Sequence, residues 1–365
     1  MHLPLLFTEK DVYMSLRKGL AFFLGLSLLV SFVVLGCTVD ASTVQMLLKA
    51  KKSALFMALG IMFCAWTCDA ARFILIARAA EEKLSFRLGI LLTWLNYFGC
   101  AITPMQGGGG PFQVFILYKN RISIGKGVAI TLTRTLLTLF LLGFVVPISI
   151  FTYPELLQGR LFLKGIFFWV AFFVTFSWVV ISLSIFRPKL IKRFAGAVVI
   201  ILNRIGFLKR RYIICAVRRV YGEIDEYNKI FRLFFSTGKI YFMWAIFFSC
   251  LHLLCFFSVL PCLIWGLGLP VHFGECVVIQ AMFMFLLYFV PTPGASGVAE
   301  GGGAALFKLL VPWNLAGVMA ISWRFFTEYL AIFMGGIVAV KLLGWGGAEK
   351  LLQGEEMRRN ACKEI

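Results

Sequence analysis

Six ionisable side chains lie inside apolar stretches of the chain, where packing alone does not account for them. They are Asp69, Arg72, Arg134, Glu300, Arg324 and Glu328. A charged side chain costs roughly 2.5–3.5 kcal/mol at the centre of a membrane helix, so such residues usually face a partner or a water-filled cavity. The guanidinium fork of arginine suits phosphate, and a carboxylate binds cations or exchanges protons. We therefore expect a polar site, suited to an anion, inside an apolar protein.

The spacing of these residues divides them into pairs and single charges. Asp69 and Arg72 are three residues apart, and Arg324 and Glu328 are four apart, so each pair can meet on one helix face. Each pair is equally well interpreted as a structural ion pair that locks helices together or as part of a site. Neither Arg134 nor Glu300 has a partner at helical spacing, which makes these two residues the stronger candidates for ligand contacts.

Two turns rich in glycine and proline offer a second way to bind an anion. They are the runs TPMQGGGGP at 103–111 and PTPGASGVAEGGG at 291–303. Glycine permits backbone conformations whose N–H groups cradle anions, and Pro111 fits the first position of a helix whose free N–H groups point at a ligand. The candidate residues are Gln106, Gly107, Gly108, Gly109, Gly110 and Gln113 in the first turn and Pro293, Gly294, Ser296 and Gly297 in the second. The alternative is that the glycines only allow tight packing and that the glutamines crosslink their hairpin.

Glu300 lies in the second turn, at the expected start of the helix that follows. A carboxylate at this position binds a cationic headgroup, exchanges protons during transport, or complements the helix dipole behind a Ser296 cap. We favour a functional role for Glu300 and keep the capping role as its alternative.

The composition shows what kind of protein must position these residues. The chain has 365 residues, of which 61% are apolar and 15% charged, and its mean hydropathy is +0.90. Soluble domains are only about 45–50% apolar and about 25% charged. The protein is therefore expected to be polytopic in a membrane, with no room for a soluble catalytic domain. Full spans are predicted at 19–37, 54–78, 127–151, 165–186, 240–267 and 314–341.

Two further apolar stretches, 88–118 and 273–310, are interrupted by the glycine-rich turns. Residues 112–118, after the first turn, reach only about 11 Å as a helix, roughly a third of the hydrocarbon core. Irregular backbone at membrane depth must be buried in protein or line a wet cavity. The predicted fold is therefore an all-α polytopic membrane protein with six spans and two oppositely oriented re-entrant hairpins, about eight membrane segments in total.

The two hairpins also resemble each other at a separation of 189 to 190 residues. Thr103-Pro104 corresponds to Thr292-Pro293, and Arg134, seven residues after the glycine of a Gly-Val pair, corresponds to Arg324 in the same position. Paired Gly/Pro-interrupted segments of opposite topology are typical of inverted-repeat transporters. Such symmetry would bring Arg134 and Arg324 toward one central cavity. The alternative is chance similarity between glycine-rich apolar segments.

The charge distribution predicts the orientation of the chain. The net charge is +19, and thirteen of the 36 Lys and Arg residues lie within 187–239, against three acidic residues. The positive-inside rule places this amphipathic segment on the cytoplasmic side, against anionic lipid rather than nucleic acid. We expect one membrane domain, 1–351, and a short tail, 352–365, with both termini cytoplasmic and the protein in the inner membrane. The ten cysteines form no CxxC pair and no His/Cys cluster, so no metal and no cofactor is expected.

The residues 291–301, together with 103–111 and the KNRIS run at 119–123, resemble the lysylphosphatidylglycerol synthase transmembrane-region family, also called flippase-like integral membrane proteins. The resemblance covers most of the chain. It implies that the protein moves a lipid between the two leaflets. In bifunctional members of the family, a separate C-terminal soluble domain synthesises that lipid. The chain ends about 24 residues after its last predicted span, so we expect a stand-alone member without that domain.

These observations together predict a flippase and not an enzyme. An anionic or amphoteric lipid would be carried by alternating access, with its phosphate held by Arg134, Arg324 and the hairpin backbone. No GxxxxGK[ST] motif occurs, so an ion gradient, including protons, or the lipid gradient supplies the energy. The alternative is a secondary transporter of a small anion or solute. An intramembrane lipid transferase with Glu300 as base is less favoured, because no nucleophile pairs with it. Membrane lipids are the expected partners, and the oligomeric state stays open.

Overall fold

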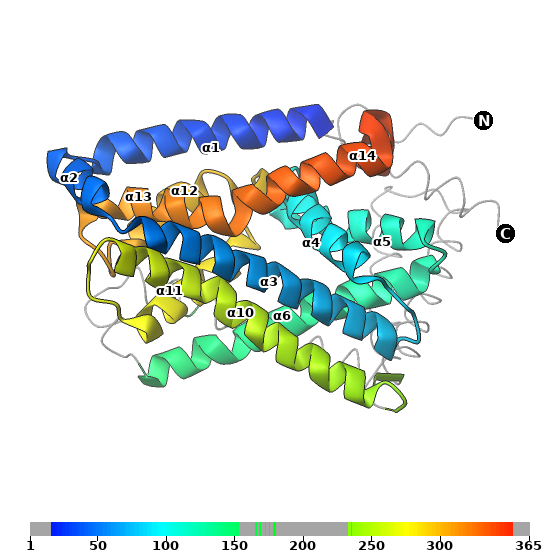
Figure 1. The fold of residues 1–365 in the computed structure, drawn as a ribbon. Helices are drawn as coiled ribbons and strands as arrows, with labels where there is room; N and C mark the ends of the chain where they lie inside the picture. Colours follow the sequence, from blue (N-terminus) through cyan, green and yellow to red (C-terminus); the bar gives the residue numbers. More distant parts are fainter. Residues whose placement is uncertain are drawn as a thin grey trace, which may run out of the picture.

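The computed structural model describes residues 16–152 and 236–352, together with isolated positions between 165 and 234. All regular elements in these described residues are helices (Figure 1). Five of them are long and apolar enough to cross a membrane: Gly19–Thr38, Lys52–Ala79, Ile124–Phe144, Lys239–Gly266 and Trp313–Leu342. They coincide with five of the six expected spans, which confirms an all-α multi-pass membrane protein. The sixth span (165–186), the basic segment (187–239) and the tail (352–365) lie almost entirely outside the described residues.

Two parts of the chain have the same order of elements. The first part consists of α3 (Lys52–Ala79), the short helices α4 (Phe86–Ala101) and α5 (Gly109–Lys119), and α6 (Ile124–Thr152). The second consists of α10 (Lys239–Gly266), the short helices α11 (Phe273–Leu287) and α12 (Val298–Phe307), and the continuous run α13 (Trp313–Arg324), η4 (Phe325–Tyr329) and α14 (Leu330–Leu352). The long helices α3 and α10 lie side by side, and the two short pairs lie toward opposite ends of the molecule (Figure 1).

The turns inside the two short pairs share one backbone conformation. In η1 (Pro104–Gln106) the proline precedes Met105 at a φ of 54°, and in η3 (Pro293–Ala295) it precedes Gly294 at a φ of 58°. The residue that follows also has a positive φ in each turn. Positive φ is uncommon for residues other than glycine, so this repetition at a separation of 189 residues supports the repeat that the sequence predicts.

The two turns are in direct contact. The Met105 N–H donates to the carbonyl of Val290 at 3.2 Å, and the Gly294 N–H donates to the carbonyl of Thr103 at 3.4 Å. Each turn therefore satisfies backbone groups of the other, which lipid cannot do. As a result, the centre of the molecule is a contact between two irregular segments.

Local chemistry corrects two expected helix starts. Helix α5 begins at Gly109 rather than at Pro111, and Pro111 lies in the first turn, where a missing N–H is tolerated. Helix α12 begins after Gly297, whose φ is 86°. Ser296 is not the cap, because its hydroxyl donates to the carbonyl of Pro293 instead.

The N-terminal helices cover the second hairpin. Helix α1 (Leu16–Thr38) brings the Phe23 ring so close to the second turn that a Cβ on Gly294 would lie 2.7 Å from it. Helix α2 (Ala41–Lys49) is capped by Asp40, whose carboxylate accepts from the Ser42 hydroxyl and the Thr43 N–H. These hydrogen bonds hold the pKa of Asp40 well below its usual range, so this cap is ionised at neutral pH.

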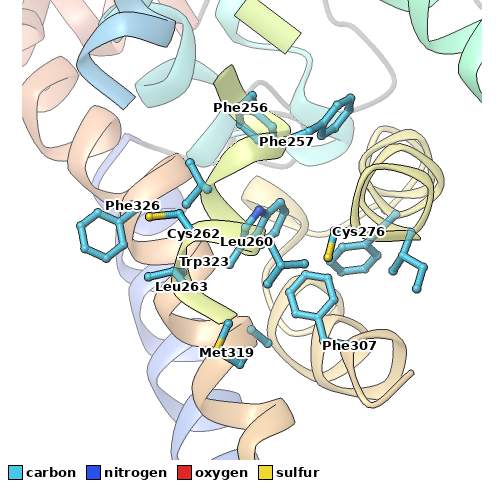
Figure 2. Close-up of a cluster of buried hydrophobic side chains, with 14 of the residues drawn as sticks. Phe256, Phe257, Leu260, Cys262, Leu263, Cys276, Phe307, Met319, Trp323 and Phe326 are labelled. Atoms are coloured by element: carbon cyan, nitrogen blue, oxygen red, sulfur yellow. The ribbon is translucent and has the colours of Figure 1, made fainter. Parts of the chain in front are cut away.

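An aromatic core fixes the end of α13. Trp323 lies among Phe256, Phe283 and Phe307, with ring centroids 5.6–6.0 Å apart (Figure 2). Its indole N–H donates to Gln280 Oε1 at 2.8 Å, so the polar edge of the ring is satisfied inside the core. Because the next residue is Arg324, this packing also fixes where that arginine emerges from the helix.

The contact between α14 and α4 leads to a test of the fold. A Cβ on Gly335 would lie 2.1 Å from the Trp94 carbonyl oxygen, whereas a Cβ on Gly60 would meet nothing within 4 Å. We expect Gly335→Ala to lower the free energy of unfolding by about 1–3 kcal/mol. Gly60→Ala should leave it unchanged or raise it by about 0.5–1 kcal/mol. Denaturant unfolding in detergent measures both, and equal stability of the two variants would contradict this arrangement of α4 and α14.

Candidate functional site

A cavity of about 420 Å³ lies where the two hairpins meet the long helices. Its walls come from both parts of the chain, from α3 and α4 through η4 and α14. The polar side chains that line it include Arg72, Tyr97, Gln106, Arg134, His252, Tyr288 and Glu328. Cavities of this size are typical of small-molecule or headgroup sites.

The first ion cluster consists of Asp69, Arg72, Thr93, Arg134 and Thr138. Asp69 is fully buried, and its Oδ1 accepts from Arg72 Nε at 2.5 Å and from Arg134 Nε at 3.1 Å. Its Oδ2 accepts from Arg134 Nη2 at 2.6 Å and from the Thr93 hydroxyl at 2.8 Å. Arg72 Nη1 donates to the Thr138 hydroxyl at 2.8 Å. The cluster therefore ties α3, α4 and α6 together through one carboxylate.

This cluster has an excess of positive charge. One carboxylate faces two guanidinium groups, and both arginines line the cavity. Arg134 has no partner at helical spacing, as expected, but it has one across helices, because Asp69 lies on another helix 65 residues earlier. An unbalanced cation at the wall of a cavity favours an anionic ligand.

The second ion cluster consists of Glu300, Arg324, Glu328 and Tyr329. Glu300 Oε2 accepts from the Gly297 N–H at 2.7 Å, and its Oε1 accepts from the Tyr329 hydroxyl at 2.7 Å. Glu300 Oε1 also lies 3.2 Å from Arg324 Nε. The capping contact considered for Glu300 is therefore present, and its side-chain partners Arg324 and Tyr329 lie 24 and 29 residues later, beyond helical spacing. Glu300 is fully buried and does not line the cavity.

Arg324 in this cluster binds the second turn and not the cavity. Its Nη2 donates to the Gly294 carbonyl at 2.6 Å and lies 3.4 Å from Glu328 Oε2. The expectation that Arg134 and Arg324 face one cavity is therefore wrong for Arg324, which is fully buried. Glu328 lines the cavity instead. It lies in η4, a π-helical turn of a kind that often marks functional sites.

The four glycines of the first turn fall into two pairs. A Cβ on Gly108 would lie 2.6 Å from the Gly99 carbonyl oxygen, and one on Gly109 would lie 2.3 Å from Asn96 Oδ1. Their small size allows α4 and α5 to approach. A Cβ on Gly107 or Gly110 would meet nothing closer than 3.6 Å, and both residues line the cavity. Helix packing therefore explains why positions 108 and 109 are glycine. It does not explain Gly107 and Gly110, which present bare backbone at the cavity wall.

The remaining candidates also divide into residues that line the cavity and residues that do not. Gln106 lines the cavity, whereas Gln113 is buried and donates to the Leu92 carbonyl at 3.0 Å, the crosslink considered as its alternative. Of the second turn only Gly294 lines the cavity, so Pro293, Ser296 and Gly297 do not.

Several residues of the site are not evident from the sequence. Thr93 and Tyr329 belong to the clusters, but their partners lie on distant parts of the chain. Thr138 carries the one local signal, because a hydroxyl four residues after a membrane arginine lies on the same helix face. His252 Nδ1 lies 2.9 Å from the Ala65 carbonyl oxygen, a contact between α10 and α3. In the described residues no group of three His, Cys, Asp or Glu side chains is close enough to hold a metal.

The part of the chain that matches known proteins contains both ion clusters and the cavity. The family model described as "Lysylphosphatidylglycerol synthase TM region" matches residues 22–335. A UPF0104 membrane protein of Archaeoglobus fulgidus is 22% identical over 312 residues, which cover 85% of this chain and 93% of that protein. The similarity therefore extends over nearly the whole length of both chains.

The role of Asp69 in holding two buried arginines can be tested by removing its charge. We expect Asp69→Asn to lower the free energy of unfolding by about 3–5 kcal/mol, because it leaves two buried guanidinium groups without a counter-charge. Glu82→Gln is the control. It breaks the ion pair between Glu82, whose side chain is 25% exposed, and Lys126, whose side chain is 35% exposed. This substitution should lower the free energy of unfolding by about 0–1 kcal/mol. Denaturant unfolding of both in detergent checks this, and equal losses would contradict the first ion cluster as a structural centre.

Proposed function

We propose that this chain, which belongs to the lysylphosphatidylglycerol synthase transmembrane-region family, translocates a phosphate-headgroup lipid across the cytoplasmic membrane. The observation that carries the proposal is the cavity, where Arg72, Arg134 and two glycines without a packing role face one space. The protein acts as a carrier and leaves the covalent structure of the lipid unchanged.

The donors at the cavity wall fit a phosphate group. Asp69 engages Nε and Nη2 of Arg134, and among the described residues no hydrogen bond occupies Nη1 of the same guanidinium, which we assign to the ligand. Gly107 and Gly110 add main-chain dipoles without side chains that would obstruct the approach of a headgroup. Charge-assisted hydrogen bonds of this kind are about twice as strong as neutral ones, so phosphate is the favoured ligand chemistry.

The hairpins would serve this function as re-entrant elements. Helices α4 and α5 have 16 and 11 residues, which correspond to about 24 and 16 Å, so each is shorter than the about 20 residues of a typical span. We place α4 and α5 as one hairpin that opens to the cytoplasm, and α11 and α12 as one that opens to the opposite side. Their turns meet near mid-membrane. Both termini are cytoplasmic in this orientation, which follows from the basic residues of 187–239.

Alternating access would then depend on a small contact. The two turns are joined by the hydrogen bonds at Met105 and Gly294, and the second turn is held by Arg324. Movement of one hairpin against the other opens the cavity to one side and closes it to the other. A lipid favours one state only if it binds that state more tightly, so Arg72 and Arg134 would have to hold the phosphate more tightly in one state than in the other.

Glu328 is the best candidate for coupling to protons or another cation. Asp69 and Glu300 are each saturated by three or more partners, whereas Glu328 has Arg324 at 3.4 Å and a side chain that is 16% exposed toward the cavity. The groups that share this cavity with it are Arg72, Tyr97, Arg134, His252 and Tyr288. A carboxylate so placed responds to the occupancy of the cavity, which is the requirement for coupling.

The function is tested by lipid translocation in proteoliposomes. Fluorescent phosphatidylglycerol, aminoacyl-phosphatidylglycerol and polyprenyl phosphate serve as probes, and dithionite quenching reports the leaflet. We expect the wild-type protein to move at least one of them without a change of lipid mass. Uptake of inorganic phosphate with no lipid movement would favour the transporter of small anions, and a change of lipid mass would favour a transferase. Either result would overturn the proposal.

Filling the cavity should stop transport without unfolding the protein. Gly110 lies in α5 with free space at its Cβ position, so Gly110→Leu adds a helix-favouring side chain that occupies the cavity. We expect at least about a tenfold loss of lipid translocation, equivalent to about 1.4 kcal/mol, at unchanged thermal stability. Gly60→Leu, on an exposed helix face, is the matched control. If both variants transport lipid equally, the cavity is not the path of the headgroup.

The two glutamates should differ in their effects. We expect Glu328→Gln to abolish stimulation by a pH gradient while it retains downhill translocation and stability. Glu300→Gln should instead lower stability by about 1 kcal/mol or more, because it weakens a helix cap and an ion pair. Transport with and without a pH gradient, together with thermal unfolding, measures both effects, and Glu275→Gln at the start of α11 is the control. Retained gradient stimulation in Glu328→Gln would reject its coupling role.

A further inference from the structure

An apolar groove of about 920 Å³ runs between α1 and the η4–α14 segment. Its walls are almost entirely aliphatic and aromatic, for example Leu24 and Leu28 on α1 and Phe333 and Ile337 on α14. It is separate from the polar cavity, although Ile332 of α14 lines both. The groove therefore lies beside the cavity on the outer face of the helix bundle.

The two walls of the groove differ in length. The part of α1 that lines it, residues 20–31, spans about 16 Å at 1.5 Å per residue. The opposite wall, from Ile321 on α13 to Lys341 on α14, spans about 30 Å, which is about the thickness of a hydrocarbon core. Helices α1 and α14 lie beside each other, with the start of α1 and the end of α14 at the same end of the molecule (Figure 1). The groove is therefore long enough for an acyl chain that starts at the Lys341 end.

Among the residues that line the groove, one is a cation. Lys341 is exposed and lines the groove next to Val340. A lysine at headgroup level attracts anionic lipid with about 1 kcal/mol, while the apolar walls below it suit a hydrocarbon chain. We propose that the groove binds one acyl chain of an anionic phospholipid, with the lipid phosphate at Lys341.

The middle of the groove touches the second ion cluster. Tyr329 lines the groove and donates its hydroxyl to Glu300, and the Arg324 guanidinium lies 5.5 Å from the Tyr329 ring and 6.0 Å from the Phe23 ring. A chain in the groove therefore lies against the two rings that cover the ion pair of the second hairpin. Occupancy of the groove is in this way linked to the element that would move during alternating access.

The groove accordingly serves as the site from which the transported lipid is loaded, with its tail between α1 and α14 beside the cavity and its headgroup at Lys341. This loading role rests on the proposed function. Binding of the acyl chain does not, because it follows from the groove and Lys341 alone.

Photocrosslinking tests the groove directly. The full chain is reconstituted in phosphatidylcholine vesicles that contain a small fraction of phosphatidylglycerol with a diazirine in its acyl chain, and labelled peptides are mapped by mass spectrometry. We expect label concentrated in residues 20–31 and 325–341 and little on α10, where Phe247 and Trp244 present an equally exposed apolar face. Label spread evenly over the lipid-facing helices would overturn the inference.

Two variants sharpen this test. Ser31→Trp fills the groove and should reduce label there by about fivefold or more, whereas Phe247→Trp on α10 should not. Lys341→Gln should reduce label from phosphatidylglycerol by about fivefold and leave label from a diazirine phosphatidylcholine unchanged. If Lys341→Gln has no effect on phosphatidylglycerol, the headgroup assignment is wrong.

Translocation measured in the same vesicles separates the two proposals. Groove labelling without any lipid movement would reject the proposed function and leave the acyl-chain site standing. Lipid movement without groove labelling would reject the acyl-chain site and leave the proposed function standing. Loss of translocation in Ser31→Trp together with loss of label is the result expected if the groove loads the transported lipid.

Discussion

The contact between the two irregular turns is the constraint on which the rest of the structure depends. Backbone that is not helical cannot face lipid, because its N–H and carbonyl groups would lack partners. Each turn here provides partners for the other, through Met105 and Gly294, and Arg324 adds a side-chain donor to the second turn. Neither hairpin is therefore satisfied alone. The long helices α3 and α10 lie side by side beneath the hairpins, and the cavity is the space that the two turns and these helices leave unfilled.

Two buried ion clusters with opposite excess charge lie beside this contact. The first has two arginines for one carboxylate, and the second has two carboxylates for one arginine. The surplus groups on each side, Arg134 and Glu328, reach the same cavity. Burying charges is expensive unless they are paired and hydrogen-bonded, so such clusters are retained where they specify a geometry or respond to a ligand. In the proposed function, a phosphate that neutralises Arg134 would change the electrostatic field at Glu328 and so link the two clusters.

The sequence predicts the scaffold better than the site. The spans follow from hydropathy, and the Asp69 and Arg72 pair follows from helical spacing, because both are local properties. Partners across helices do not follow, so the contacts Arg134–Asp69 and Glu300–Tyr329 are visible only in the fold. The same reason explains why the four glycines of the first turn look alike in sequence. Only the approach of α4 shows that packing requires Gly108 and Gly109, whereas Gly107 and Gly110 remain as bare backbone at the cavity. Arg324 lies behind the cavity, where it donates a hydrogen bond to the Gly294 carbonyl. The spacing of residues along the sequence does not reveal this contact.

The central claim is that the cavity holds a lipid phosphate at Arg134. The most direct measurement is an experimental structure of the protein in nanodiscs that contain phosphatidylglycerol, determined by electron cryo-microscopy with a rigid antibody fragment. We predict phosphate density within hydrogen-bonding distance of the Arg134 guanidinium and beside Gly110, and loss of that density in Arg134→Lys. A cavity that contains water alone, with headgroups bound only at the membrane surface, would contradict it.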